Sequence, residues 1–176
     1  MLVTIFFAIH RHYKTVAKNL TLTDFNPPRH ANRHRVLLLV SNVHRGSLTA
    51  LHYARMLSDD VTAIHVSLDP QHSLSVQSKW EQWGDGVRLV IIESPYRLLV
   101  EPLLEYIDKI YNLRQPGEMI TVVVPQFVPE RSWANLLHAQ TALWLRMALL
   151  FKPGIVITEV PYQVRTPKDL QEETEK

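Results

Sequence analysis

The residues best suited to bind an anion follow the first apolar segment of the chain. The segment Ser41–Ser47 (SNVHRGS) connects a predicted strand to a predicted helix. Backbone N–H groups and the dipole at a helix N-terminus attract phosphate, and the guanidinium of Arg45 can donate two parallel hydrogen bonds to it. The candidate binding residues of this segment are Ser41, Asn42, His44 and Arg45. The alternative is that Gly46 and Ser47 only form the turn and cap the helix.

A second polar group, Ser94–Arg97 (SPYR), follows the third apolar segment. Tyr96 offers a ring on which a base can stack, and Arg97 offers a second guanidinium. Ser94, Tyr96 and Arg97 are therefore further candidate binding residues. The alternative is a plain strand-to-helix turn with Pro95 near the helix start.

Glycine spacing argues against the common phosphate-binding enzymes. The chain has only five glycines, and no pair has the spacing of a P-loop or of a G-x-G-x-x-G turn. No G-x-S-x-G segment for a nucleophilic serine is present either. We therefore expect that the chain is not an enzyme.

Metal and nucleic-acid binding are also not expected. The nine histidines are scattered, no cysteine accompanies them, and no H-E-x-x-H occurs. The net charge of +2 is too small to indicate a nucleic-acid partner.

Short apolar segments alternate with amphipathic ones through the middle of the chain. The predicted strands are Arg35–Asn42, Val61–Leu68, Val87–Ile92, Ile120–Val124 and Ile155–Val160. The predicted helices are Ser47–Ser58, Pro70–Trp83, Leu98–Leu113 and Ser132–Phe151. A helix in every connection predicts an α/β domain over residues 35–164, with a five-stranded parallel sheet, doubly wound in a flavodoxin-like order, and helices on both faces.

The strand order suggests where a ligand would bind. The first and fourth strands are the most apolar, so we expect them at the centre of the sheet. If the winding reverses between them, a crevice opens at their carboxyl ends. This places the loops 41–47 and 125–132 at the mouth of one site, and Gln126 of the second loop joins the candidates.

The two ends of the chain differ from its middle. Residues Met1–Ile9 are almost entirely apolar, and a basic stretch containing Arg11, Tyr13 and Lys14 follows. This order is typical of the cytoplasmic end of a transmembrane helix. We expect residues 1–20 to be such an end with its basic segment at the membrane surface, 21–34 to be a linker, and 165–176 to be a disordered tail. The alternative is an amphipathic helix that packs on its own domain.

The predicted helix Ser132–Phe151 is apolar on most sides. Because an outer helix of this kind needs cover on both faces, we expect a homodimer through this helix or the last strand. The alternative is cover by the N-terminal segment. His138 on this helix is a candidate binding residue, with a satisfied core or interface histidine as the alternative.

Several blocks of the chain resemble the C-terminal cytosolic domain of transporters of the amino acid–polyamine–organocation superfamily, in particular amino acid permeases and Kup-like potassium importers. The blocks are His34–Val40, Ser94–Arg97, Val124–Pro129, Trp133 and Leu136–Ala142, with His10–Lys14 similar to the junction after the last membrane helix. The resemblance implies a dimeric domain similar to universal stress proteins, on the cytoplasmic face of the cell membrane.

In Kup-like importers of this type, the domain binds cyclic di-AMP, which inhibits transport. The resemblance therefore implies a regulatory domain of an amino acid or cation transporter, with cyclic di-AMP as the regulatory ligand and the membrane domain of the transporter as partner. ATP is disfavoured because residues 125–132 contain no glycine. The alternative function is a free-standing soluble nucleotide-binding protein of the universal stress type.

Overall fold

The computed structural model describes residues 2–21, 33–94, 98–128 and 135–163. Two units make up the chain, Met1–His30 and Ala31–Lys176. The first contains helix α1, Leu2–Leu20, whose apolar residues Ile5, Phe6 and Phe7 are exposed. In the described parts of the chain, no helix is long and apolar enough to cross a membrane.

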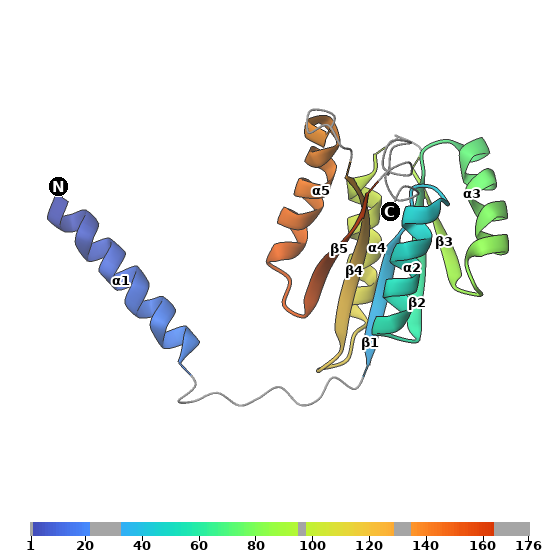
Figure 1. Ribbon diagram of the computed structural model, residues 1–176. Coiled ribbons are helices and arrows are strands. Elements are labelled where there is room, and N and C mark those ends of the chain that lie inside the picture. The colour runs from blue at the N-terminus through green and yellow to red at the C-terminus, as the bar shows by residue number, and fades with distance from the viewer. Residues whose placement is uncertain (1, 22–32, 95–97, 129–134, 164–176) are drawn as a thin grey trace, which may run out of the picture. The chain divides into compact units, whose positions relative to one another are not determined.

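The second unit is built on one parallel sheet (Figure 1). Its strands are β1 His34–Leu39, β2 Asp60–Ser67, β3 Arg88–Glu93, β4 Met119–Val128 and β5 Ile155–Gln163. The strand order is β3-β2-β1-β4-β5, and every pairing is parallel. The predicted α/β fold with a five-stranded parallel sheet is confirmed, and β1 and β4 are adjacent at its centre.

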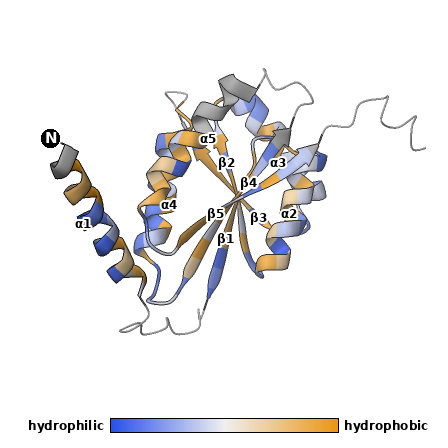
Figure 2. Cartoon of the chain, turned by 60° about the vertical axis from the view of Figure 1, so that its left-hand side comes forward, coloured by the Kyte–Doolittle hydropathy of each residue, from blue (hydrophilic) through white to orange (hydrophobic). Residues whose placement is uncertain are grey.

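Two helices cover each face of the sheet. They are α2 Arg45–Leu57, α3 Pro70–Trp83, α4 Val100–Asn112 and α5 Asn135–Leu150. Helices α2 and α3 pack through Ala54 and Trp80 on one face, in a core that includes Val36 and Leu38. Helices α4 and α5 pack through Ile107 and Leu149 on the other face, together with Leu37. The alternation of side chains along a strand explains why the run at β1 is apolar throughout. Figure 2 shows the apolar strands enclosed by these helices.

Proline affects two element boundaries differently. Helix α4 starts at Val100, so Pro102 lies in its first turn, where the missing N–H breaks no intrahelical hydrogen bond.

Strand β4, by contrast, continues through Pro125 to Val128 and pairs there with β5 alone, because the pairing with β1 ends at Val123. Residues 125–128, which were expected to be the first part of a loop, therefore belong to strand β4. Proline is tolerated where a strand has lost one neighbour.

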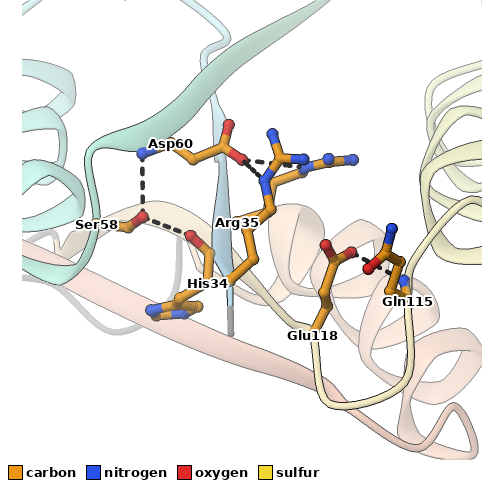
Figure 3. Close-up of polar contacts among 7 residues, drawn as sticks. His34, Arg35, Ser58, Asp60, Gln115 and Glu118 are labelled. Carbon is orange, nitrogen blue, oxygen red and sulfur yellow. Dashed lines mark hydrogen bonds and ion pairs between the residues drawn. The ribbon is translucent and has the colours of Figure 1, made fainter. Parts of the chain in front are cut away.

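The amino-terminal edge of the sheet is closed by polar contacts (Figure 3). Asp60 accepts hydrogen bonds from Arg33 at 2.7 Å and from Arg35 at 3.4 Å. The Ser58 hydroxyl donates to the backbone oxygen of His34 and accepts from the backbone N–H of Asp60 at 3.0 Å. Nearby, the Glu118 carboxylate accepts the backbone N–H of Gln115 at 3.1 Å. The contacts of Asp60 and Ser58 join the start of β1 to the start of β2.

Candidate functional site

A cavity of about 700 Å³ lies at the carboxyl ends of β1, β2 and β4. The chain winds from β1 to β2 and β3 on one side and continues through β4 to β5 on the other. The cavity is therefore at the point where the winding reverses, which is where ligands bind in open α/β sheets. Its apolar wall includes Leu39, Val66, Val100, Leu103, Val124 and Leu145. Its polar wall includes Ser41, Asn42, His44, Ser47, His65, Asp69 and His72.

The first polar side of the cavity is the N-terminus of α2. His44 is the N-cap residue, and its Nδ1 accepts the backbone N–H of Ser47 at 3.0 Å. In return, the Ser47 hydroxyl oxygen accepts the backbone N–H of His44 at 2.9 Å. This reciprocal arrangement is a capping box. The cap is therefore made by His44 with Ser47 as its partner, and the N–H groups of Arg45 and Gly46 have no acceptor within the helix.

The second polar side joins β2 to α3. His65 is only 3% exposed, and its Nδ1 lies 2.8 Å from the backbone oxygen of Val40. Its Nε2 lies 3.1 Å from the Ser73 hydroxyl, which lies 2.7 Å from the Ser67 hydroxyl. His72 is exposed, with its Nε2 3.2 Å from the backbone oxygen of Ser41. The rings of His65 and His72 are 5.8 Å apart.

Two of these imidazoles are held in the neutral form. Burial lowers the pKa of His44 below its ordinary value, against the opposing effect of a backbone hydrogen bond. Burial also lowers the pKa of His65. The hydrogen bond to Val40 opposes this effect, and the nearby His72 lowers the pKa further. Near pH 7 the wall thus combines apolar side chains with these two neutral imidazoles, and Asp69 is its acidic side chain.

The structure brings three of the predicted binding residues into this cavity, namely Ser41, Asn42 and His44. Asn42 is half-buried and its side-chain oxygen accepts the backbone N–H of Val43 at 2.8 Å. Arg45 is exposed and is not among the described residues of the cavity wall.

The other predicted binding residues lie elsewhere. Ser94 is 6% exposed and lines a separate cavity of about 660 Å³ between α3 and β3. Gln126 is exposed on β4, in register with Pro161 of β5. Tyr96 and Arg97 lie outside the described residues, as does the side chain of His138.

Sequence reasoning missed His65, Asp69 and His72. The predicted candidates lie after the first, third and fourth strands and on the last helix, whereas these residues come from the end of β2 and the first turn of α3. One signal was available: Asp69 followed by Pro70 indicates a capped helix start. That signal places His72 in the first turn, next to the end of β2.

The chemistry of the wall suits binding rather than metal ligation. In the described part of the chain, no group of three or more histidine, cysteine or acidic side chains could hold a metal ion. The described wall contains neither lysine nor arginine. It combines apolar side chains with a small number of hydrogen-bonding groups, as small-molecule sites do.

Comparison with known proteins identifies relatives of the whole second unit. Residues 32–162 match the family described as the KimA potassium transporter C-terminal domain. The potassium transporter KimA of Bacillus subtilis (strain 168) is 34% identical over 167 residues, which are 94% of this chain and 27% of that transporter. The chain thus spans about a quarter of the length of this curated relative.

A solved structure, pantothenate synthetase from Thermus thermophilus, shares 15% identity at a TM-score of 0.39, covering 77% of this chain and 58% of that one. This likeness carries no argument about function. The family match, by contrast, includes β1 to β4, β5 as far as Tyr162, and both polar sides of the cavity. This chain belongs to the family of KimA potassium transporter C-terminal domains.

Proposed function

We propose that this domain is the cytosolic regulatory part of a potassium transporter, and that it binds a nucleotide such as cyclic di-AMP in the cavity at the carboxyl ends of β1, β2 and β4. The observation that supports the proposal is the position of this cavity at the reversal point of the sheet. Its volume of about 700 Å³ lies within the range of roughly 300–1,000 Å³ of small-molecule sites. Family membership favours a transporter domain over a free-standing stress-type protein.

Calorimetry on the full 176-residue chain tests the ligand. We expect heat of binding with cyclic di-AMP, and weaker or no binding with ATP. Ser41→Trp places a large ring at the exposed rim of the cavity and should abolish binding. Ser75→Trp is the matched control, because Ser75 is exposed on α3 outside the described wall. No heat with either nucleotide would contradict the nucleotide proposal.

Family membership supports a partner for the domain, namely the membrane part of the same transporter. The membrane part of the same transporter would lie next to it, and the apolar and basic residues of α1 would continue a membrane helix onto the cytoplasmic face. Reading the DNA before the codon for Met1 tests this part. An in-frame run of hydrophobic spans supports it, and a stop codon with a ribosome-binding site directly before Met1 contradicts it.

A homodimer through α5 belongs to the same proposal. Five apolar residues on one side of α5 and its end are exposed, and two of them are Trp144 at 69% and Phe151 at 79%. The other three are Leu143, Met147 and Leu150. Leu145 and Leu149 on the opposite side are buried in the core. A helix that is apolar on both sides requires a second cover, and an identical subunit supplies one by twofold symmetry.

Light scattering after size exclusion tests the dimer. The full chain should have the mass of two copies, and Trp144→Glu should reduce it to one. Met56→Glu is the matched control, because Met56 is comparably exposed on α2. A wild-type chain that is monomeric at high concentration would contradict this part.

A further inference from the structure

The cavity at the carboxyl ends of β1, β2 and β4 has imidazoles where an anion site ordinarily has lysine or arginine. The ionisable groups of its described wall are His44 from α2, His65 from β2, and Asp69 and His72 from α3. The residues that β1, β4, α4 and α5 contribute to this wall have no ionisable side chain. With every imidazole neutral, the only formal charge of the described wall is that of Asp69. A negative charge repels phosphate, so a positive charge elsewhere in the wall would strengthen the binding of a phosphate-bearing ligand beyond what the N–H groups of α2 supply.

His44 cannot supply that charge without loss of structure. Its Nδ1 already accepts the backbone N–H of Ser47, which closes the N-terminus of α2. A proton on Nδ1 would remove this acceptor and break the cap. The proton of the neutral ring is therefore on Nε2, and His44 acts as a neutral hydrogen-bond donor.

His65 is built to accept a proton without losing a partner. A carbonyl oxygen only accepts, so Nδ1 of His65 donates to the backbone oxygen of Val40. In the neutral ring, Nε2 accepts from the Ser73 hydroxyl. In the protonated ring, Nε2–H donates to the same hydroxyl. The Ser73 hydrogen then turns to Ser67 Oγ at 2.7 Å or to the backbone oxygen of Asp69 at 3.0 Å.

His72 is the second imidazole beside the cavity with one nitrogen bonded to a backbone oxygen. Its Nε2 donates to the backbone oxygen of Ser41, which leaves Nδ1 as the nitrogen that takes up a proton. The ring is exposed and lies 5.8 Å from that of His65. Charge on His72 disfavours charge on His65 in the empty cavity. An anion near both rings offsets this repulsion and stabilises both imidazolium ions.

We propose that the cavity binds its phosphate-bearing ligand together with protons, which His65 and His72 take up when the anion enters. This inference rests on the proposed nucleotide function and adds its regulation by pH. Because the bound complex holds more protons than the separate partners, affinity rises as pH falls. Between about pH 8 and about pH 6, where imidazoles titrate, we expect affinity to rise by about fivefold or more.

Calorimetry of the full chain with cyclic di-AMP as probe measures the linkage directly. Titrations in two buffers of different ionisation enthalpy, each at both pH values, give the number of protons taken up on binding. His72→Gln keeps an amide N–H for the backbone oxygen of Ser41 and removes the nitrogen that we propose takes up the proton. His65→Gln keeps an amide N–H for the backbone oxygen of Val40 and removes the ring nitrogens of the buried histidine. His52→Gln is the matched control, because His52 is exposed on α2 outside the described wall.

Wild type and His52→Gln should take up protons on binding and bind more tightly at the lower pH. His72→Gln should take up fewer protons and lose most of the pH dependence, whether or not the buried variant folds. Binding of cyclic di-AMP with equal affinity at both pH values and no proton uptake overturns this inference and leaves the proposed function standing. No binding at either pH overturns both.

Discussion

Polar side chains lie at both edges of the sheet, but they close the amino edge and line a cavity at the carboxyl edge. At the amino edge, Asp60 holds Arg33 and Arg35, and Ser58 links the backbones of β1 and β2 (Figure 3). At the carboxyl edge, His65 and His72 contact the backbone oxygens of Val40 and Ser41, and a cavity of about 700 Å³ lies beside these contacts. The first edge is closed by permanent charges, whereas the second is lined by imidazoles whose charge depends on pH.

The difference follows from the geometry of parallel strands. Every connection must cross from the carboxyl end of one strand to the amino end of another, and helices on both faces diverge where the winding reverses. The cavity thus forms at the carboxyl edge, beyond the ends of β1, β2 and β4. Contacts at the amino edge can therefore be optimised for stability without affecting a ligand. The comparison predicts that changes at one edge will affect stability and changes at the other will affect binding.

The largest effect on stability is expected for Ser58→Ala at the amino edge. The hydroxyl bridges the backbone oxygen of His34 and the backbone N–H of Asp60, and both groups are half-buried. Loss of the bridge leaves two backbone groups unpaired, which costs about 2 kcal/mol. Urea denaturation measures the change, and cyclic di-AMP affinity should stay as in wild type. A change in affinity of about tenfold or more would show that the two edges are coupled, since that corresponds to about 1.4 kcal/mol of binding free energy.

A smaller effect is expected at His44, which belongs to the carboxyl edge but has a structural task. His44→Ala removes the N-cap of α2 and should lower the free energy of unfolding by about 1 kcal/mol. His44→Asn keeps an oxygen for the N–H of Ser47 and should retain most of the stability. Urea denaturation of the two variants shows whether the loss of stability comes from the missing cap. Equal loss in both would contradict the capping role.

Sequence patterns predicted the fold well because its signals are local. Apolar runs bounded by polar residues indicated every strand, and helix α3 was predicted at its observed bounds because its apolar residues lie between Pro70 and the turn that begins at Gly84. The extension of β4 through Pro125 was not predicted, since it depends on pairing with β5, which lies far along the chain.

The site was predicted only in part, because its contacts also join residues that lie far apart in the sequence. The loop after β1 could be found from the position of a polar segment after a buried strand. The meeting of His65 with Ser73 and His72 depends on which helix covers that face of β2. Both faces of this sheet are covered, so alternation along the strand does not say which neighbour a side chain meets. The imidazole pair is visible only after the strand order is known.

The smallest expected effect is a loss of stability in acid that originates at the carboxyl edge. The pKa of His44 and that of His65 are lowered from 6.5 by burial. Between the folded and unfolded pKa values, the unfolded chain therefore binds more protons than the folded chain. The free energy of unfolding is unaffected well above pH 6.5 and falls as pH drops below it.

Urea denaturation at a series of pH values measures this loss. His65→Gln and His44→Asn should each flatten the acid slope in proportion to the proton that the variant no longer takes up on unfolding. His52→Gln should keep the slope of wild type, because its exposed ring lies on α2 outside the described cavity wall. Under the proposed proton-linked binding, saturating cyclic di-AMP should oppose the loss, since the bound anion would favour the protonated folded chain. An acid slope that is the same in all three variants would place its origin outside the cavity, and the contrast between the edges would then be one of shape alone.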